Sequence, residues 1–289
     1  MVAGSRILWG GHLGSLSWDA ALVVVSDIHL QSPEDMRGRL LLRLLEDIAA
    51  EPPEYLVLLG DIFDFCLGSH PFFQRKFAAI GEALSRVAAA GTKVLFIEGN
   101  HEFRMIDLPW PGVDVIENGT YTIALKSGVK VQMAHGDMIY SHRRYKAFRR
   151  LVKSSLVTGI ARYLPGPWMD RLATTGSEVS RSADQYRTIQ HDHILGAVDR
   201  WLENGAGDYG IFGHFHVPYA EPRRDGRLGG VYSVECWDKP NVLAFRQGAF
   251  FRLEFEGTHL GDWKPALPLI RSHLLAAASR PPQPFPSPT

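Results

Sequence analysis

Residues 21–29 read Ala-Leu-Val-Val-Val-Ser-Asp-Ile-His, an apolar run that ends abruptly in polar side chains. A continuous apolar run of this length is typical of a strand buried on both faces of a parallel sheet. Two similar runs follow at residues 55–59 and 93–97, and helical spacing of apolar residues predicts helices at 37–50 and 72–90 between them. This alternation of strands and helices predicts an α/β fold built on a parallel sheet covered by helices.

The pattern changes after residue 100. Residues 142–201 read mostly helical, with an interruption at Pro165-Gly166-Pro167. Short strands are predicted on both sides of this stretch, at residues 113–116, 121–125, 129–133, 209–212, 231–235, 242–246 and 250–255. We expect the last three of these strands to complete a second half-sheet. We expect one domain over residues 1–276, a helical lid inserted at about residues 140–200, and a disordered Pro-rich tail at residues 277–289.

Composition narrows the class of protein. The 289 residues carry a formal net charge of zero, so no global field steers the chain toward nucleic acid, and we expect no nucleic-acid partner. No apolar stretch reaches the roughly 18 residues of a membrane-spanning helix. Two cysteines, Cys66 and Cys236, do not make a disulfide framework and suit a reducing compartment. We therefore expect a cytoplasmic protein.

Five polar clusters follow predicted strands, and this is the most informative feature of the chain. Ligand sites in open α/β sheets form at the carboxyl ends of strands, so these clusters are expected to meet at one edge. The clusters are Asp27-Ile-His29, Gly60-Asp61, Gly99-Asn100-His101-Glu102, His135-Gly136-Asp137 and Gly213-His214-Phe-His216.

The residue types in these clusters suit divalent metal ions. Carboxylates, an amide oxygen and neutral imidazoles bind Mn²⁺, Fe or Zn²⁺, whereas the absence of thiolates argues against a structural zinc site. A single histidine at a strand end is more often a structural residue, and a single Gly-Asp is more often a turn. The five clusters together predict a metal site.

The five clusters, in this order, resemble the signature of the calcineurin-like metallophosphoesterases, D-x-H, G-D, G-N-H-[DE], H-G-D and G-H-x-H. The resemblance implies a four-layer αββα sandwich and two divalent ions, Mn²⁺ before Fe or Zn²⁺. It implies that Asp61 bridges the ions, and that His101 acts over the scissile phosphate as a general acid or charge stabiliser. The first ion would be held by Asp27, His29, Asp61 and His216, and the second by Asp61, Asn100, His135 and His214.

Within that family the chain is similar to the UDP-2,3-diacylglucosamine hydrolases of lipid A synthesis. The similarity lies in residues 26–30, 59–64, 135–137 and 145–149, and in a helical lid between the H-G-D and G-H-x-H clusters. It implies hydrolysis of a pyrophosphate to UMP and an acylated sugar phosphate, with a nucleotide-linked or lipid-linked substrate. The residues expected to bind this substrate are Asn100, His101, Tyr145, Arg149, Ser177 and Arg181.

The lid segment between Tyr140 and Arg171 is rich in Lys and Arg and contains a single acidic residue, Asp170. One interpretation is a lid that contacts anionic lipid, at the inner membrane, or phosphate, and the other is a solvated basic face over a core-facing apolar stripe.

The sequence does not decide the identity of the substrate. The lipid-specific group commonly reads G-N-R-D where this chain has Gly-Asn-His101-Glu102. A phosphoesterase acting on soluble nucleotides, phosphodiesters or phosphoproteins is therefore the alternative, and a non-catalytic binding scaffold is a third. The sequence leaves the oligomeric state open.

Overall fold

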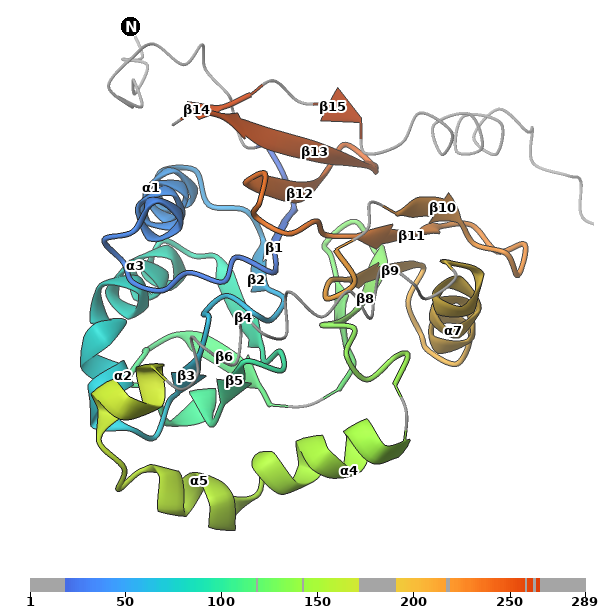
Figure 1. The fold of residues 1–289 in the computed structure, drawn as a ribbon. Helices are drawn as coiled ribbons and strands as arrows, with labels where there is room; N and C mark the ends of the chain where they lie inside the picture. Colours follow the sequence, from blue (N-terminus) through green and yellow to red (C-terminus); the bar gives the residue numbers. More distant parts are fainter. Residues whose placement is uncertain are drawn as a thin grey trace, which may run out of the picture.

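Two β-sheets packed face to face form the centre of the protein, as the computed structural model shows (Figure 1). It describes residues 19–117, 119–141, 143–171, 191–216, 219–257, 259–261 and 264–265. Residues 1–18 and the Pro-rich tail lie outside the described residues.

The first sheet contains the parallel strands that the sequence predicts. Its centre is β1 (Leu22–Val25), β2 (Tyr55–Leu58), β4 (Lys93–Ile97) and β6 (Val113–Ile116), all parallel and in that spatial order. On the other edge of β1 lie antiparallel β12 (Asn241–Arg246) and β13 (Ala249–Glu256), followed by β14 (His259–Leu260) and β15 (Lys264–Pro265), which both pair with β13. The carboxyl ends of the parallel strands therefore meet at one edge.

The second sheet has the order β10 (Ala220–Pro222), β11 (Gly230–Ser233), β9 (Tyr209–Phe212), β8 (Lys130–Ala134) and β7 (Tyr121–Ala124). Its strands β8, β9 and β11 are parallel, so they too deliver their ends to one edge. A small parallel pair, β3 (Cys66–Leu67) and β5 (Glu102–Phe103), lies beside the first sheet.

Alternation along the strands explains the four layers. In β1, Leu22 and Val24 face the second sheet, whereas Val23 and Val25 face the helices α1 (Met36–Ala50) and α3 (Ala78–Ala89). On the far face of the second sheet, α7 (His191–Glu203) packs Ile194 and Val198 against that sheet. The expected α/β fold and αββα sandwich are confirmed.

Two expectations about individual elements are wrong. Strands 242–246 and 250–255 join the first sheet instead of the second, because β12 pairs with the exposed edge of β1 and hides it. The helix expected at 72–90 is two helices, α2 (Pro71–Lys76) and α3, since the chain bends at Phe77 and buries that ring against Phe63 at 4.2 Å between centroids.

The described part of the lid consists of α4 (Arg143–Val152), α5 (Ser155–Ala161) and the chain to residue 171, and it continues at α7. Figure 1 draws α4 and α5 along the lower edge of the molecule, outside both sheets. None of the described helices has the length and apolar composition that crossing a bilayer requires.

Candidate active site

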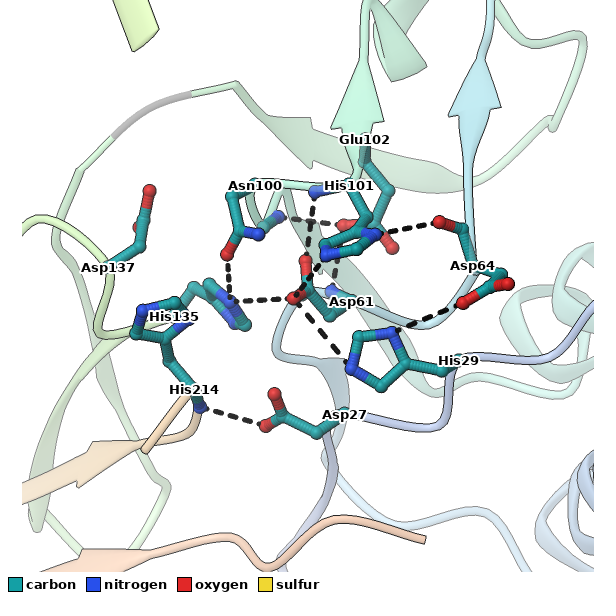
Figure 2. A network of polar contacts seen from close by, with 12 residues as sticks. Asp27, His29, Asp61, Asp64, Asn100, His101, Glu102, His135, Asp137 and His214 are labelled. Atoms are coloured by element: carbon teal, nitrogen blue, oxygen red, sulfur yellow. Dashed lines mark hydrogen bonds and ion pairs between the residues drawn. The ribbon is translucent and has the colours of Figure 1, made fainter. Parts of the chain in front are cut away.

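The polar clusters meet where the strand ends of the two sheets converge (Figure 2). The first sheet supplies its side chains from the turns after β1, β2 and β4, and the second sheet supplies its side chains from the turns after β8 and β9. The structure brings together the residues expected to bind metal, namely Asp27, His29, Asp61, Asn100, His135, His214 and His216.

Asp61 is the centre of this arrangement. Its Oδ2 atom lies 3.3 Å from His135 Nε2 and 3.9 Å from His29 Nε2. The same oxygen lies 3.9 Å from His101 Nε2. Each of these imidazoles comes from a different strand end, so one carboxylate faces ligands from both sides of the site (Figure 2).

Three groups of side chains have potential ligand atoms within 4.8 Å of one another. These groups are Asp27, His29 and His216; His29, Asp61 and His101; and Asp61, His135 and His214. Asn100 joins the third group through its Oδ1 atom, 3.2 Å from His135 Nε2.

The backbone of the site is strained. Seven non-glycine residues in the described part of the chain have positive φ, and five of them are expected metal ligands: Asp27, His29, Asp61, His214 and His216. Such a conformation costs about 1–3 kcal/mol per residue and persists only where the surrounding structure imposes it. This concentration of strain at one place is typical of a functional site.

Two glycines allow the loops to approach the carboxylates. A Cβ atom on Gly99 would clash with Asp61 Oδ1, and one on Gly213 would clash with Ser26 Oγ and Asp27 Oδ2. The sequence motif needs glycine here because the backbone itself lines the site.

Backbone carbonyls orient two of the imidazoles. His135 donates from Nδ1 to Leu59 O at 2.9 Å, and His101 donates from Nδ1 to Asp64 O at 2.7 Å. Because a carbonyl only accepts, each ring keeps its Nε2 atom directed at Asp61.

The buried carboxylates shift the protonation of their neighbours. Burial lowers the pKa of His135, but the Asp61 carboxylate more than offsets this effect and raises that pKa to about 10. His216 behaves in the same way, since its hydrogen bond to Asp27 outweighs burial and raises its pKa to about 10. Burial lowers the pKa of His29 and of His214 to about 4. The pocket therefore favours positive charge beside Asp27 and Asp61.

The residues fit a pair of divalent ions. Asp27 Oδ1 and His29 Nδ1 are buried without a hydrogen-bond partner in the described part of the chain, although Asp27 Oδ1 lies 3.3 Å from His216 Nε2. Carboxylate and amide oxygens together with imidazole nitrogens are the donor set of Mn²⁺, Fe and Zn²⁺ sites. A buried cation would satisfy Asp27 Oδ1 and balance the carboxylates, whereas His29 Nδ1 faces away from Asp61 and lies 3.9 Å from Asp64 Oδ1.

Glu102 has a role that the sequence motif did not reveal. Its carboxylate is fully buried and accepts four backbone N–H groups, from Asp61 at 2.9 Å, Ile62 at 2.6 Å, Phe63 at 3.2 Å and Gly99 at 2.7 Å. These bonds join the loop after β2 to the loop after β4. The only indication of this role in the sequence was that Glu102 directly follows His101 in the motif.

The lid is bonded directly to the loops of the site. Asp137 accepts a hydrogen bond from Tyr145 Oη at 3.2 Å and lies 2.5 Å from Arg149 Nε. Lys153 donates to Glu98 Oε2 at 2.8 Å and to Gly99 O at 2.9 Å. Helix α4 and Lys153, the residue that follows it, therefore hold the segments that follow His135 and precede Asn100.

The residues expected to bind substrate lie in different places. Asn100 and His101 lie in the site, whereas Tyr145 and Arg149 lie at its rim with their polar atoms directed at Asp137. Ser177 and Arg181 lie outside the described residues.

Comparison with known proteins identifies similar sequences. The sequence model of the family described as "Calcineurin-like phosphoesterase" matches residues 20–218. A UDP-2,3-diacylglucosamine hydrolase of Neisseria meningitidis serogroup B is 28% identical over 66% of this chain and 80% of that protein. One from Azotobacter vinelandii is 27% identical over 82% of this chain and 96% of that protein. A solved structure of a dimetal phosphatase from Danio rerio, 12% identical, covers 85% of this chain and 98% of that chain with a TM-score of 0.40.

Proposed function

Because the chain belongs to the calcineurin-like phosphoesterase family, we propose that it hydrolyses the pyrophosphate bond of UDP-2,3-diacylglucosamine to UMP and 2,3-diacylglucosamine 1-phosphate. The family and the similar hydrolases identify it as a hydrolase of phosphoric ester or pyrophosphate bonds. The observation that carries the chemistry is the convergence of imidazoles from four strand ends on the Asp61 carboxylate.

Two divalent ions are implied by the family, and we assign their ligands here. Asp27, His29, Asp61 and His216 would hold one ion, and Asp61, Asn100, His135 and His214 would hold the other. When bound, such a pair supplies Lewis acidity at the phosphoryl group and activates water at neutral pH. We propose Mn²⁺ as the native ion, with Fe and Zn²⁺ as alternatives.

His101 is proposed as the residue that acts on the phosphate. Its Nδ1–H is fixed on Asp64 O, so the Nε2 atom faces the site beside Asp61. From there it can donate a proton to the leaving oxygen or stabilise charge on the phosphoryl group. Asn100 presents its amide to the same space and would position the phosphate.

The lid is proposed to select the substrate. The family match spans residues 20–218 and therefore contains the whole lid, which supports a lid inserted at about residues 140–200 within one domain. We propose that this domain covers residues 1–276 and that a tail follows at residues 277–289. Tyr145 and Arg149 lie close enough to the site to reach a sugar phosphate if they leave Asp137, and Ser177 and Arg181 remain proposed contacts. A diacylated substrate would place the enzyme at the cytoplasmic side of the inner membrane.

The alternative is a phosphoesterase of soluble nucleotides or phosphodiesters, and His101 favours it. The lipid-specific group commonly has arginine at this position, whereas His101 matches the general signature of the phosphoesterase family.

A hydrolysis assay with Mn²⁺ decides between these functions. It compares UDP-2,3-diacylglucosamine, bis(p-nitrophenyl) phosphate and a dinucleotide polyphosphate, with Asp61→Ala as the control. We expect turnover of the lipid nucleotide, and loss of all turnover in the Asp61 variant. Hydrolysis of the soluble compounds alone would refute the proposed substrate. An active Asp61→Ala enzyme would refute the proposed metal site.

A further inference from the structure

Two cations of the lid bind to the two loops that carry ligands of the second proposed ion. From α4, Arg149 Nε lies 2.5 Å from Asp137 Oδ2. Directly after α4, Lys153 Nζ lies 2.8 Å from Glu98 Oε2 and donates to Gly99 O at 2.9 Å. The lid therefore reaches the loop after β8 with one cation and the loop after β4 with the other.

Both acidic partners stand two positions from a ligand assigned to the second ion. Asp137 follows His135 by two positions, and Glu98 precedes Asn100 by two positions. His135 Nε2 and Asn100 Oδ1 lie 3.2 Å apart, so the two loops meet in the space proposed for that ion. Figure 2 draws Asp137 outside the network of contacts around Asp61. Because two residues span at most about 7 Å of backbone, a shift of either acidic residue would also move the neighbouring ligand.

Both ion pairs are buried, so the two loops depend on the cations of the lid. The side chains of Asp137 and Glu98 are 3% and 1% exposed, and those of Arg149 and Lys153 are 8% and 10% exposed. Removing one partner of a buried pair leaves a charge that nothing compensates. A cavity of about 70 Å³ lies beside these groups, and Glu98, His135, Asp137 and Arg149 are among its lining residues. Without its cation, either carboxylate is therefore expected to turn toward water in this space and to displace its loop.

Residues outside the lid hold the ligands of the first ion. Trp237 N donates to Asp27 O at 3.1 Å. Arg37 on α1 donates to Ile28 O at 2.7 Å, and this carbonyl lies between Asp27 and His29 in the sequence. The two halves of the site are therefore supported by different parts of the molecule.

We propose that Arg149 and Lys153 are positioning residues for the second metal site, so that the second ion binds tightly only while α4 is packed against the loops. This inference rests on the proposed function, because it uses the ligands assigned there to two ions. Packed in this way, α4 holds His135 and Asn100 at the separation that one ion requires. A lid that moves away from the loops would leave the first ion in place and release the second.

Binding of Mn²⁺ to the full chain tests the proposal without substrate. Metal is removed with a chelator, Mn²⁺ is added back in steps, and free Mn²⁺ is measured from its electron paramagnetic resonance signal. The test variants are Lys153→Met and Arg149→Met, which act through different loops, so that one remains informative if the other fails to fold. Arg150→Met is the matched control, because it removes an exposed cation from the same helix.

We expect the parent and the Arg150→Met control to bind two ions alike. Each test variant should bind one ion as the parent does and the other about tenfold or more weakly, since loss of a group that orients a metal ligand typically costs about 10–100-fold in affinity. Lys153→Arg keeps a cation beside Glu98 and should weaken the second ion less than Lys153→Met does.

Combination with ligand variants identifies the ion that is weakened. His29→Ala removes a ligand assigned to the first ion only, so adding Lys153→Met should weaken the ion that remains by about tenfold. Asn100→Ala removes a ligand assigned to the second ion only, so adding Lys153→Met should leave the remaining ion unchanged.

Three results would overturn the proposal. The first is unchanged binding of both ions in both test variants. The second is an equal loss at the two ions, because that result indicates a general loss of stability. The third is a parent chain that binds fewer than two ions, which would overturn the assigned ion pair as well. The expected pattern in a protein that does not hydrolyse UDP-2,3-diacylglucosamine would support the inference and refute only the proposed substrate.

Discussion

Replacing Glu102 by glutamine is expected to destabilise the loops that hold Asp61 and Gly99. The carboxylate is fully buried and accepts four backbone N–H groups, two on Oε1 from Ile62 and Phe63 and two on Oε2 from Asp61 and Gly99. An amide has one oxygen and one NH₂ group, so it can accept on one side only. In either orientation of the amide, two N–H groups lose their acceptor and face a donor.

The magnitude follows from the count of lost bonds. Leaving a buried donor unsatisfied costs about 1–3 kcal/mol, so two such groups cost about 2–6 kcal/mol. This is a large fraction of the roughly 5–15 kcal/mol that stabilises a typical folded protein. The loss is local to the loops after β2 and β4, and we therefore expect Mn²⁺ affinity to fall together with stability.

Urea unfolding followed by tryptophan fluorescence measures the effect, with bound Mn²⁺ per chain as the second readout. Glu82→Gln is the matched control, because Glu82 is exposed on α3 and its replacement should change stability by less than about 0.5 kcal/mol. If Glu102→Gln unfolds at the same urea concentration as the parent and binds as much Mn²⁺, the four hydrogen bonds do not hold the site together.

Three further predictions concern the site and the lid. His101→Ala should lower kcat by about 10²–10⁴-fold while bound Mn²⁺ stays at the parental level, because a proton donor is lost and no assigned ligand is removed; unchanged kcat would exclude His101 from the reaction. Removal of metal with a chelator should abolish hydrolysis and lower the Tm, and Mn²⁺ should restore both; a Tm that does not respond would contradict two buried ions between the sheets. Lys153→Met should destabilise the protein by about 3–5 kcal/mol, because the Glu98 carboxylate stays buried without its cation. The control is Arg150→Met, which changes an exposed residue on α4. Equal urea midpoints for the two variants would refute this prediction.

Local patterns in the sequence were sufficient for the architecture around the site. Apolar runs such as residues 21–25, each followed by polar residues, predict parallel strands whose ends share one edge, and the structure confirms that arrangement for β1, β2 and β4. The residues expected to bind metal come together for the same reason, since a motif at a strand end takes its position from the strand.

Such local patterns do not predict how distant segments pair. The strands at 242–246 and 250–255 carry apolar residues on both faces, which suits either sheet, and only the exposed edge of β1 decides which one they join. The bend at Phe77 likewise depends on a ring contact with Phe63, which no helical periodicity encodes.

The sequence by itself determined which side chains meet around Asp61, because residue type and position relative to a strand are local properties. The tertiary structure alone decided how those side chains are held. Glu102 accepts hydrogen bonds from backbone groups about forty residues away, and Lys153 donates to Glu98 across 55 positions. Which side chains of α5 are exposed likewise depends on the side of that helix that packs against the protein. Side-chain direction and long-range burial set these features, and neither is written in a local motif.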